Sequence, residues 1–205
     1  MEFFYASLLF ALSATITPGP NNIMIMTSGL NYGVKKSLPH LFGICLGFPA
    51  MVIIVGLGFG IVFETYPVLH QLIKIAGILY LLYLAWMIAS AKPSDFKSAD
   101  TESKPLSFIQ AVLFQWVNPK AWVMVTGAVA AYTSTQGNVF IQVFAIAMAF
   151  FIVAFPCVGS WLYFGVGMRQ VLQKPNYQRA FNILMALLLV LSITPVIVEL
   201  INHYI

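Results

Sequence analysis

The chain has few charged residues. Of its 205 residues, ten are Lys or Arg and six are Asp or Glu, together 8%, whereas 60% are hydrophobic. A soluble domain has about 25% charged residues, so this chain has too few polar groups to cover a surface exposed to water. The shortage excludes a soluble globular enzyme, a disordered chain, a collagen-like fibre and a disulfide-stapled secreted domain. An integral membrane protein is the class that remains.

Cysteine and the motifs of catalysis are also scarce. The two cysteines, Cys45 and Cys157, lie inside apolar runs without the spacing of a CxxC motif or a metal site, and free cysteines of this kind are usually buried. The sequence has no nucleophile–base spacing, no phosphate-binding loop and no cluster of metal-ligating residues. We therefore expect neither an enzyme nor a bound cofactor or metal.

Apolar residues are abundant and come in long unbroken runs. Such runs predict transmembrane α-helices, which need about 20 apolar residues each, and they argue against a β-barrel, whose strands alternate over about ten residues. We predict an all-α integral membrane protein with six transmembrane helices, forming one domain over 1–205 with a polar cytoplasmic linker at about 92–105. The six runs cover about 3–30, 38–63, 68–91, 106–132, 139–167 and 180–201.

Lys and Arg favour one side of this arrangement. Eight of them fall in the loops after the first, third and fifth runs, whereas the opposite side has only Lys74. The positive-inside rule places those three loops in the cytoplasm and both termini on the periplasmic or extracellular side. Because topology explains the net charge of +4, we expect the lipid bilayer and no nucleic acid as a partner. The eight residues are Lys35, Lys36, Lys92, Lys97, Lys104, Arg169, Lys174 and Arg179.

Proline breaks the first and the fourth run at matching places. Pro18 lies in Thr-Pro-Gly-Pro-Asn-Asn and Pro119 lies in Asn-Pro-Lys, 101 positions later. A proline inside a helix frees backbone groups, so we predict that new helices begin at Pro20 and Pro119, the second with Asn118 as its N-cap. Three spans in each half imply two inverted repeats, at about 1–91 and 106–205, as in many secondary transporters.

The two breaks define a candidate site. Both new helices would begin near the bilayer midplane, where their positive N-terminal ends suit a carboxylate, and Lys120 adds a full charge at that depth. The carbonyls before each break, around 15–17 and 116–117, with Asn21 or Asn22, are candidate partners of a substrate ammonium. The alternative is that Lys120 only satisfies backbone carbonyls freed by the break. The candidate substrate-binding residues are Pro18, Gly19, Pro20, Asn21, Asn22, Gln115, Asn118, Pro119 and Lys120.

No acidic residue falls deep inside a run. This absence argues against a buried ion pair with Lys120 and against a site for cationic amino acids, so a small neutral amino acid is the favoured ligand. The six acids, all at run ends or in loops, are Glu2, Glu64, Asp95, Asp100, Glu102 and Glu199.

The two broken motifs resemble those of the LysE/RhtB family of bacterial amino-acid exporters. The resemblance covers the whole chain and implies a multi-pass inner-membrane exporter that exchanges amino acids with protons, with the motif residues 18–20 and 118–120 at its broken-helix centre. Many members have an acidic residue after Thr-Pro-Gly-Pro, where this chain has Asn21. The Pro-Asn-Asn form is similar to that of members associated with cysteine and O-acetylserine export.

The leading hypothesis is a secondary active exporter of small neutral amino acids or their derivatives. An ion or small-anion channel and a non-transporting membrane scaffold are the alternatives that the sequence leaves open. The exported amino acid, the coupling ion and the oligomeric state are also open, and a homodimer is compatible with so short a transporter chain.

Overall fold

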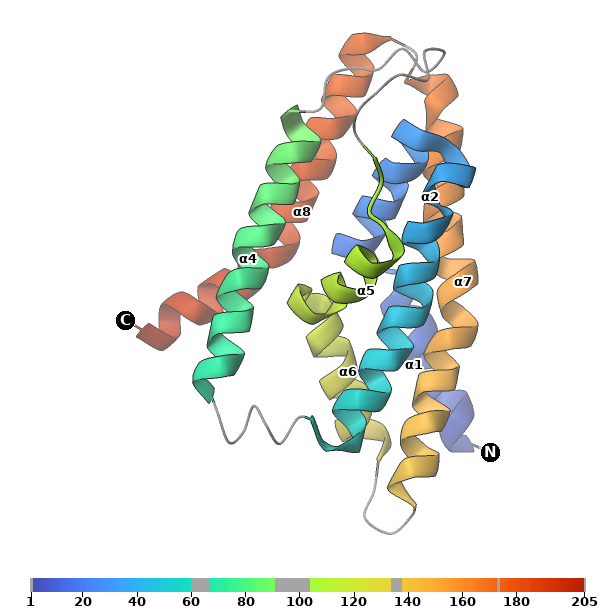
Figure 1. Cartoon of the computed structure of the whole chain (residues 1–205), viewed down its shortest axis with the longest axis vertical. Coiled ribbons are helices and arrows are strands. Elements are labelled where there is room, and N and C mark those ends of the chain that lie inside the picture. The colour runs from blue at the N-terminus through green and yellow to red at the C-terminus, as the bar shows by residue number, and fades with distance from the viewer. Residues whose placement is uncertain (1, 60–66, 91–103, 134–137, 173, 205) are drawn as a thin grey trace.

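The computed structural model describes residues 2–59, 67–90, 104–133, 138–172 and 174–204 (Figure 1). All regular structure in these ranges is helical, which confirms the predicted all-α class. A π-helical turn, η1, follows directly on the second helix. The elements are α1 (Glu2–Ile16), α2 (Pro20–Ile54), η1 (Val55–Phe59), α4 (Pro67–Ser90), α5 (Phe108–Val117), α6 (Pro119–Tyr132), α7 (Val139–Val171) and α8 (Pro175–Tyr204).

The two predicted helix starts are confirmed. α2 begins at Pro20 after a three-residue link from α1, and α6 begins at Pro119 after the single residue Asn118. Proline suits the first position of a helix because its missing N–H has no partner there anyway. In Figure 1 the junction between α5 and α6 lies about halfway along the long axis of the molecule.

α2 contains a reversal that the sequence did not predict. Its first segment, 20–32, rises to the top of Figure 1, and its second segment, 34–54, returns downward. Gly33 alone makes the turn, with φ 74° and ψ 178°, a conformation that glycine adopts without a steric penalty. The prediction of a loop around Lys35 and Lys36 was therefore wrong: both residues are helical, because one glycine suffices to reverse the chain.

Glycines bring the helices of the core close together. α2 packs against α7 and α5, α1 packs against α7, and α4 packs against α8. A Cβ on Gly43 would lie 2.6 Å from the carbonyl oxygen of Phe108, and one on Gly47 would lie 2.9 Å from Cα of Val112. These two glycines therefore allow α2 and α5 to approach each other closely.

The described surface has the character expected of a membrane protein. By length and composition, Val139–Arg169 is long and apolar enough to cross a bilayer, and so is Pro20–Gly58 when it is counted across the reversal at Gly33. Large apolar side chains such as Leu9, Phe140 and Leu191 are more than 60% exposed. Such a surface favours contact with lipid over contact with water.

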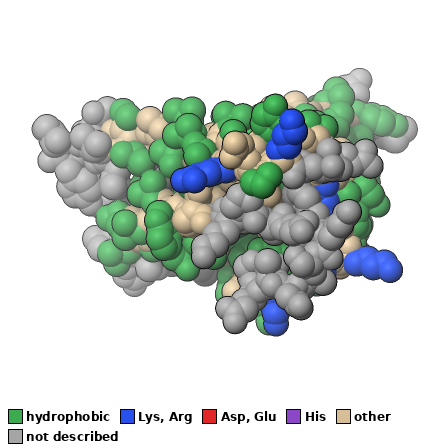
Figure 2. All heavy atoms as spheres, turned by 90° about the horizontal axis from the view of Figure 1, so that it is seen from above, with side chains coloured by type: hydrophobic (Ala, Val, Ile, Leu, Met, Phe, Trp, Pro, Cys, Tyr) green, Lys and Arg blue, Asp and Glu red, His purple; other side chains and the backbone are tan. Residues whose placement is uncertain are grey.

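Basic side chains gather at one end of the molecule. The Gly33 bend, the end of α7 and the start of α8 lie at the top of Figure 1, and the segment before α5 descends from that end. Figure 2, which views that end, shows several Lys and Arg side chains and no described acidic one. Lys92 and Lys97 lie outside the described residues. We call this the basic end; its described members are Lys35, Lys36, Lys104, Arg169, Lys174 and Arg179.

Candidate functional site

The break between α1 and α2 leaves backbone carbonyls without helical partners, and side chains satisfy them. Asn22 Nδ2 donates to the carbonyl oxygens of Thr15 and Thr17, both at 2.8 Å. The indole Nε1 of Trp161 on α7 donates to the carbonyl oxygen of Ile16 at 3.1 Å. A buried carbonyl without a partner is costly in a membrane, so these two side chains make the break possible.

The break between α5 and α6 consists of one residue, Asn118, and side chains again form hydrogen bonds with the backbone groups that it leaves without helical partners. Asn118 is 1% exposed, and its side-chain oxygen accepts from the backbone N–H of Lys120 at 3.1 Å. The predicted N-cap is therefore confirmed. The indole Nε1 of Trp122 donates to the carbonyl oxygen of Trp116 at 2.8 Å.

Lys120 joins the two breaks. Its Nζ donates to the carbonyl oxygen of Thr17 at 2.7 Å, to Thr17 Oγ1 at 2.8 Å and to the carbonyl oxygen of Pro18 at 3.3 Å. Since an ammonium group has three protons, all of them have an acceptor in this arrangement. The expectation that the two breaks lie side by side is confirmed.

A reciprocal amide pair makes a second link between the broken helices. Asn21 Nδ2 donates to Gln115 Oε1 at 2.8 Å, and Gln115 Nε2 donates back to Asn21 Oδ1 at 3.2 Å. Gln115 is fully buried and also donates to the carbonyl oxygen of Ala111 at 2.8 Å. These bonds fix which face of Asn21 remains available to the site.

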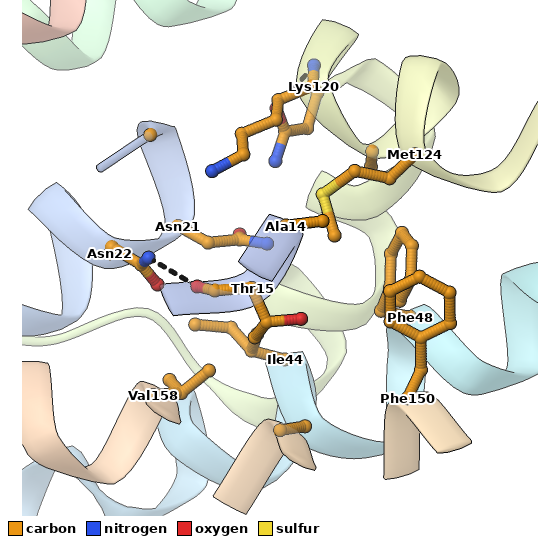
Figure 3. A pocket seen from close by; sticks show the side chains of 14 residues that line it. Ala14, Thr15, Asn21, Asn22, Ile44, Phe48, Lys120, Met124, Phe150 and Val158 are labelled. Atoms are coloured by element: carbon orange, nitrogen blue, oxygen red, sulfur yellow. Dashed lines mark hydrogen bonds between the residues drawn. The ribbon is translucent and has the colours of Figure 1, made fainter. Parts of the chain in front are cut away.

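A cavity of about 40 Å³ lies where the two breaks meet. In Figure 3 its polar side chains, Lys120, Asn21 and Asn22, lie toward one end, and apolar ones lie toward the other. A polar end beside an apolar end suits a small molecule with a charged head and a short side chain. The lining residues are Ala14, Thr15, Gly19, Asn21, Asn22, Ile44, Phe48, Asn118, Lys120, Ala121, Met124, Phe150, Ala154 and Val158.

The predicted site residues fall into three groups: residues that line the cavity, residues that form hydrogen bonds with a lining residue, and prolines that begin a helix. Gly19, Asn21, Asn22, Asn118 and Lys120 line the cavity. Pro18 contributes its carbonyl oxygen to Lys120, and Gln115 holds Asn21. The helix-starting prolines, Pro20 and Pro119, shape the breaks.

The carbonyl oxygens of residues 15–17 and of Trp116 were named as candidate partners of a substrate ammonium. Each already accepts at least one hydrogen bond from the protein. Sequence reasoning missed Trp122 and Trp161. The signal was available, because an indole N–H in an apolar environment needs an acceptor, and a broken helix provides acceptors.

Among the described groups, only neutral carbonyl and hydroxyl dipoles, and no carboxylate, stabilise the positive charge of Lys120. Lys120 contacts carbonyl and hydroxyl oxygens. No side chain caps the first turn of α2, so the positive end of that helix dipole also faces the region of the break. An anion placed here would gain from both features.

We predict that Gly19→Ala impairs transport without unfolding the protein. Gly19 has φ −176° and ψ 179°, an extended backbone that alanine also adopts, but its Cβ would lie 2.5 Å from Cδ of Lys120. The lysine must therefore move. Overpacking costs about 1–3 kcal/mol, so we expect about a tenfold loss of transport at a normal amount of membrane protein.

The matched control is Gly159→Ala, because nothing lies within 4 Å of a Cβ at Gly159. Transport rates of both variants would be measured in proteoliposomes at equal protein amounts. Equal rates for Gly19→Ala and Gly159→Ala would contradict the assigned position of the Lys120 side chain.

Comparison with known proteins agrees with this geometry. The sequence profile of the LysE type translocator family matches residues 12–193, which include both breaks. The chain belongs to this family. The LysE/RhtB resemblance of the two motifs is thereby confirmed, and the family is one of translocators.

Relatives of this LysE-type chain include three bacterial proteins with the same description. The cysteine/O-acetylserine efflux proteins of Escherichia coli (strain K12), Shigella sonnei (strain Ss046) and Shigella flexneri are each 29% identical over 182 residues, covering 88% of this chain and 90% of the relative. No solved structure matches the chain.

Proposed function

We propose that the protein is a secondary active exporter of small neutral amino acids or their derivatives. The observation that carries the proposal is the Lys120 ammonium, which bonds only neutral oxygens of the described residues, in a cavity where two broken helices meet. Family membership and the efflux relatives support an export function. The names of those relatives make cysteine and O-acetylserine the first candidates.

The cavity supports a specific binding mode. The substrate carboxylate would replace the carbonyl oxygen of Pro18, which makes the longest of the three bonds to Lys120 at 3.3 Å. Asn22 Nδ2 is committed to backbone carbonyls, which leaves Asn22 Oδ1 as an acceptor for the substrate ammonium. Ile44, Phe48 and Phe150 would contact the side chain.

Size is the second source of selectivity in this proposal. A cavity needs about 10–15 Å³ to hold a single water molecule, so 40 Å³ leaves room for a few waters at most. Cysteine has seven heavy atoms and needs more space than that. Binding therefore requires the site to widen, and Lys120 moving away from Pro18 would widen it.

The arrangement of the helices supports six spans in two inverted repeats. A shift of 101 residues relates Pro18 to Pro119, the segment 34–54 to α7, and α4 to α8. Lys120, next to Pro119, donates to the carbonyl oxygen of Pro18, α2 packs against α7, and α4 packs against α8. Parts of two repeats that face each other across an axis in the membrane plane would pack in this way.

The basic end would face the cytoplasm. The positive-inside rule then places both termini on the outer side of the bacterial inner membrane, and substrate moves from the basic end towards the opposite end. We propose exchange with protons as the energy source. The carrier of the proton is a separate question from the carboxylate site.

Transport by the purified chain in proteoliposomes tests the function. We expect an imposed pH gradient to drive labelled cysteine or O-acetylserine across the membrane in the direction opposite to the protons. Unlabelled substrate on the far side should accelerate this movement. A channel would give flux without this trans-stimulation, and a scaffold would give no flux. Either result would overturn the proposal.

A further inference from the structure

A second cavity lies between α2, α4 and the start of α5. It has a volume of about 120 Å³ and is separate from the Lys120 cavity. Half of its lining is polar, and one of the polar residues, Lys104, belongs to the basic end. The polar residues are Thr27, Ser28, Asn31, Tyr32, His40 and Lys104; the others are Met24, Leu84, Met87, Ile88, Pro105 and Leu106.

His40 is the unusual group in this cavity. It is only 1% exposed, and its Nδ1 lies 3.0 Å from Ser28 Oγ. Its other nitrogen, Nε2, is buried without a hydrogen-bond partner in the described structure. A buried polar atom without a partner costs about 1–3 kcal/mol, so its retention points to a ligand that supplies the missing bond.

The two cavities lie along one face of one helix. Asn21 lines the first cavity, and Ser28 and Asn31 line the second. Positions 21 and 28 are seven residues apart, so their side chains share a face and lie about 10 Å apart at 1.5 Å per residue. Asn21, Ser28 and Asn31 are therefore polar positions on the helical segment that runs from the break to the basic end.

We propose that the second cavity is a binding site for the amino-acid substrate on its way to the Lys120 cavity. This inference rests on the proposed function. Lys104 binds the carboxylate, and the ammonium or a side-chain polar group binds the oxygens of Ser28 and Asn31 or the Nε2 of His40. With two separate sites, one substrate molecule can bind in the second cavity while another occupies the Lys120 cavity.

Volume supports this assignment. The second cavity has about three times the volume of the Lys120 cavity, about 120 Å³ against about 40 Å³. The substrate does not fit the 40 Å³ cavity before that cavity widens. In this conformation the substrate is therefore accepted by the cavity nearer the basic end.

Cysteine accessibility tests the inference. Met87 lines the cavity and is 44% exposed, so the thiol of Met87→Cys would report on its contents. The two native cysteines are buried, and the unsubstituted chain gives their background. O-acetylserine is the probe because it has no thiol, and a water-soluble methanethiosulfonate is the labelling reagent.

We expect saturating O-acetylserine to slow labelling of Met87→Cys at least fivefold. The protection should persist when Lys120→Met is added, and His40→Leu or Lys104→Gln should raise the half-protecting concentration at least fivefold. Lys35→Cys is the matched control, because Lys35 is exposed at the same end and does not line the cavity. Its labelling should not change.

Two outcomes would overturn the second site. These are protection that disappears with Lys120→Met, and absence of protection in a chain that still exports. The last outcome leaves the proposed function intact. Conversely, protection without any export by the unsubstituted chain would keep the binding site and reject the exporter.

Discussion

Lys120→Gln is expected to reduce export about 30-fold or more while the protein still folds. Glutamine keeps an N–H donor for the carbonyls of Thr17 and Pro18, although its side chain is one bond shorter, but it removes the charge. Leaving a buried carboxylate without its charged partner costs about 2–5 kcal/mol, and 2 kcal/mol corresponds to about 30-fold. The loss should appear in initial export rates from proteoliposomes.

This substitution also separates the two roles considered for Lys120. If the lysine only satisfies the carbonyls of the break, glutamine should restore near-normal export and Lys120→Met should not. If it binds the substrate carboxylate, both variants should fail, and the glutamine variant should be the more stable to heat. Normal export by Lys120→Gln would show that export does not need the positive charge of Lys120.

Gly165→Ala is expected to cause the largest loss of folded protein. A Cβ on Gly165 would collide with the carbonyl oxygen of Met26 and would lie 3.1 Å from the backbone N of Leu30. Both contacts are with backbone atoms, so α7 itself must move away from α2. We expect a cost near the upper end of the usual 1–3 kcal/mol for overpacking.

At about 2–4 °C for each kcal/mol, that cost lowers the unfolding midpoint of the detergent-solubilised protein by about 6–12 °C. Gly167→Ala is the matched control, because nothing lies within 4 Å of its Cβ. Alanine also favours a helix over glycine by about 1 kcal/mol, so the control should be as stable as the original or more so. Equal midpoints for the two variants would refute the close contact between α2 and α7.

The broken helices could be predicted from sequence because proline chemistry is local. Pro20 and Pro119 have no N–H to donate and suit the first position of a helix, and Asn118 is a strong N-cap type. Each conclusion needs only neighbouring residues. The meeting of the breaks was assumed for the candidate site rather than derived, because it depends on contacts such as that of Lys120 with Thr17, 103 positions away.

Other features depend on residues far apart in the chain. Trp161 lies 145 positions from Ile16, whose carbonyl oxygen it satisfies, and no local pattern connects them. Gly33 reverses α2 through a positive φ, which sequence alone cannot assign to one glycine among 14. The pairing of His40 with Ser28 exists only because of that reversal.

Solid-state NMR can measure the central contact directly. The protein would be labelled with ¹⁵N at its lysine Nζ atoms and combined with O-acetylserine carrying ¹³C in the carboxylate, and dipolar recoupling would report the distance between the two nuclei. We predict a distance below about 4 Å, as in a charge-assisted hydrogen bond, that disappears in Lys120→Gln. Substrate bound with no such coupling, or with a coupling that survives the substitution, would contradict a carboxylate site at Lys120.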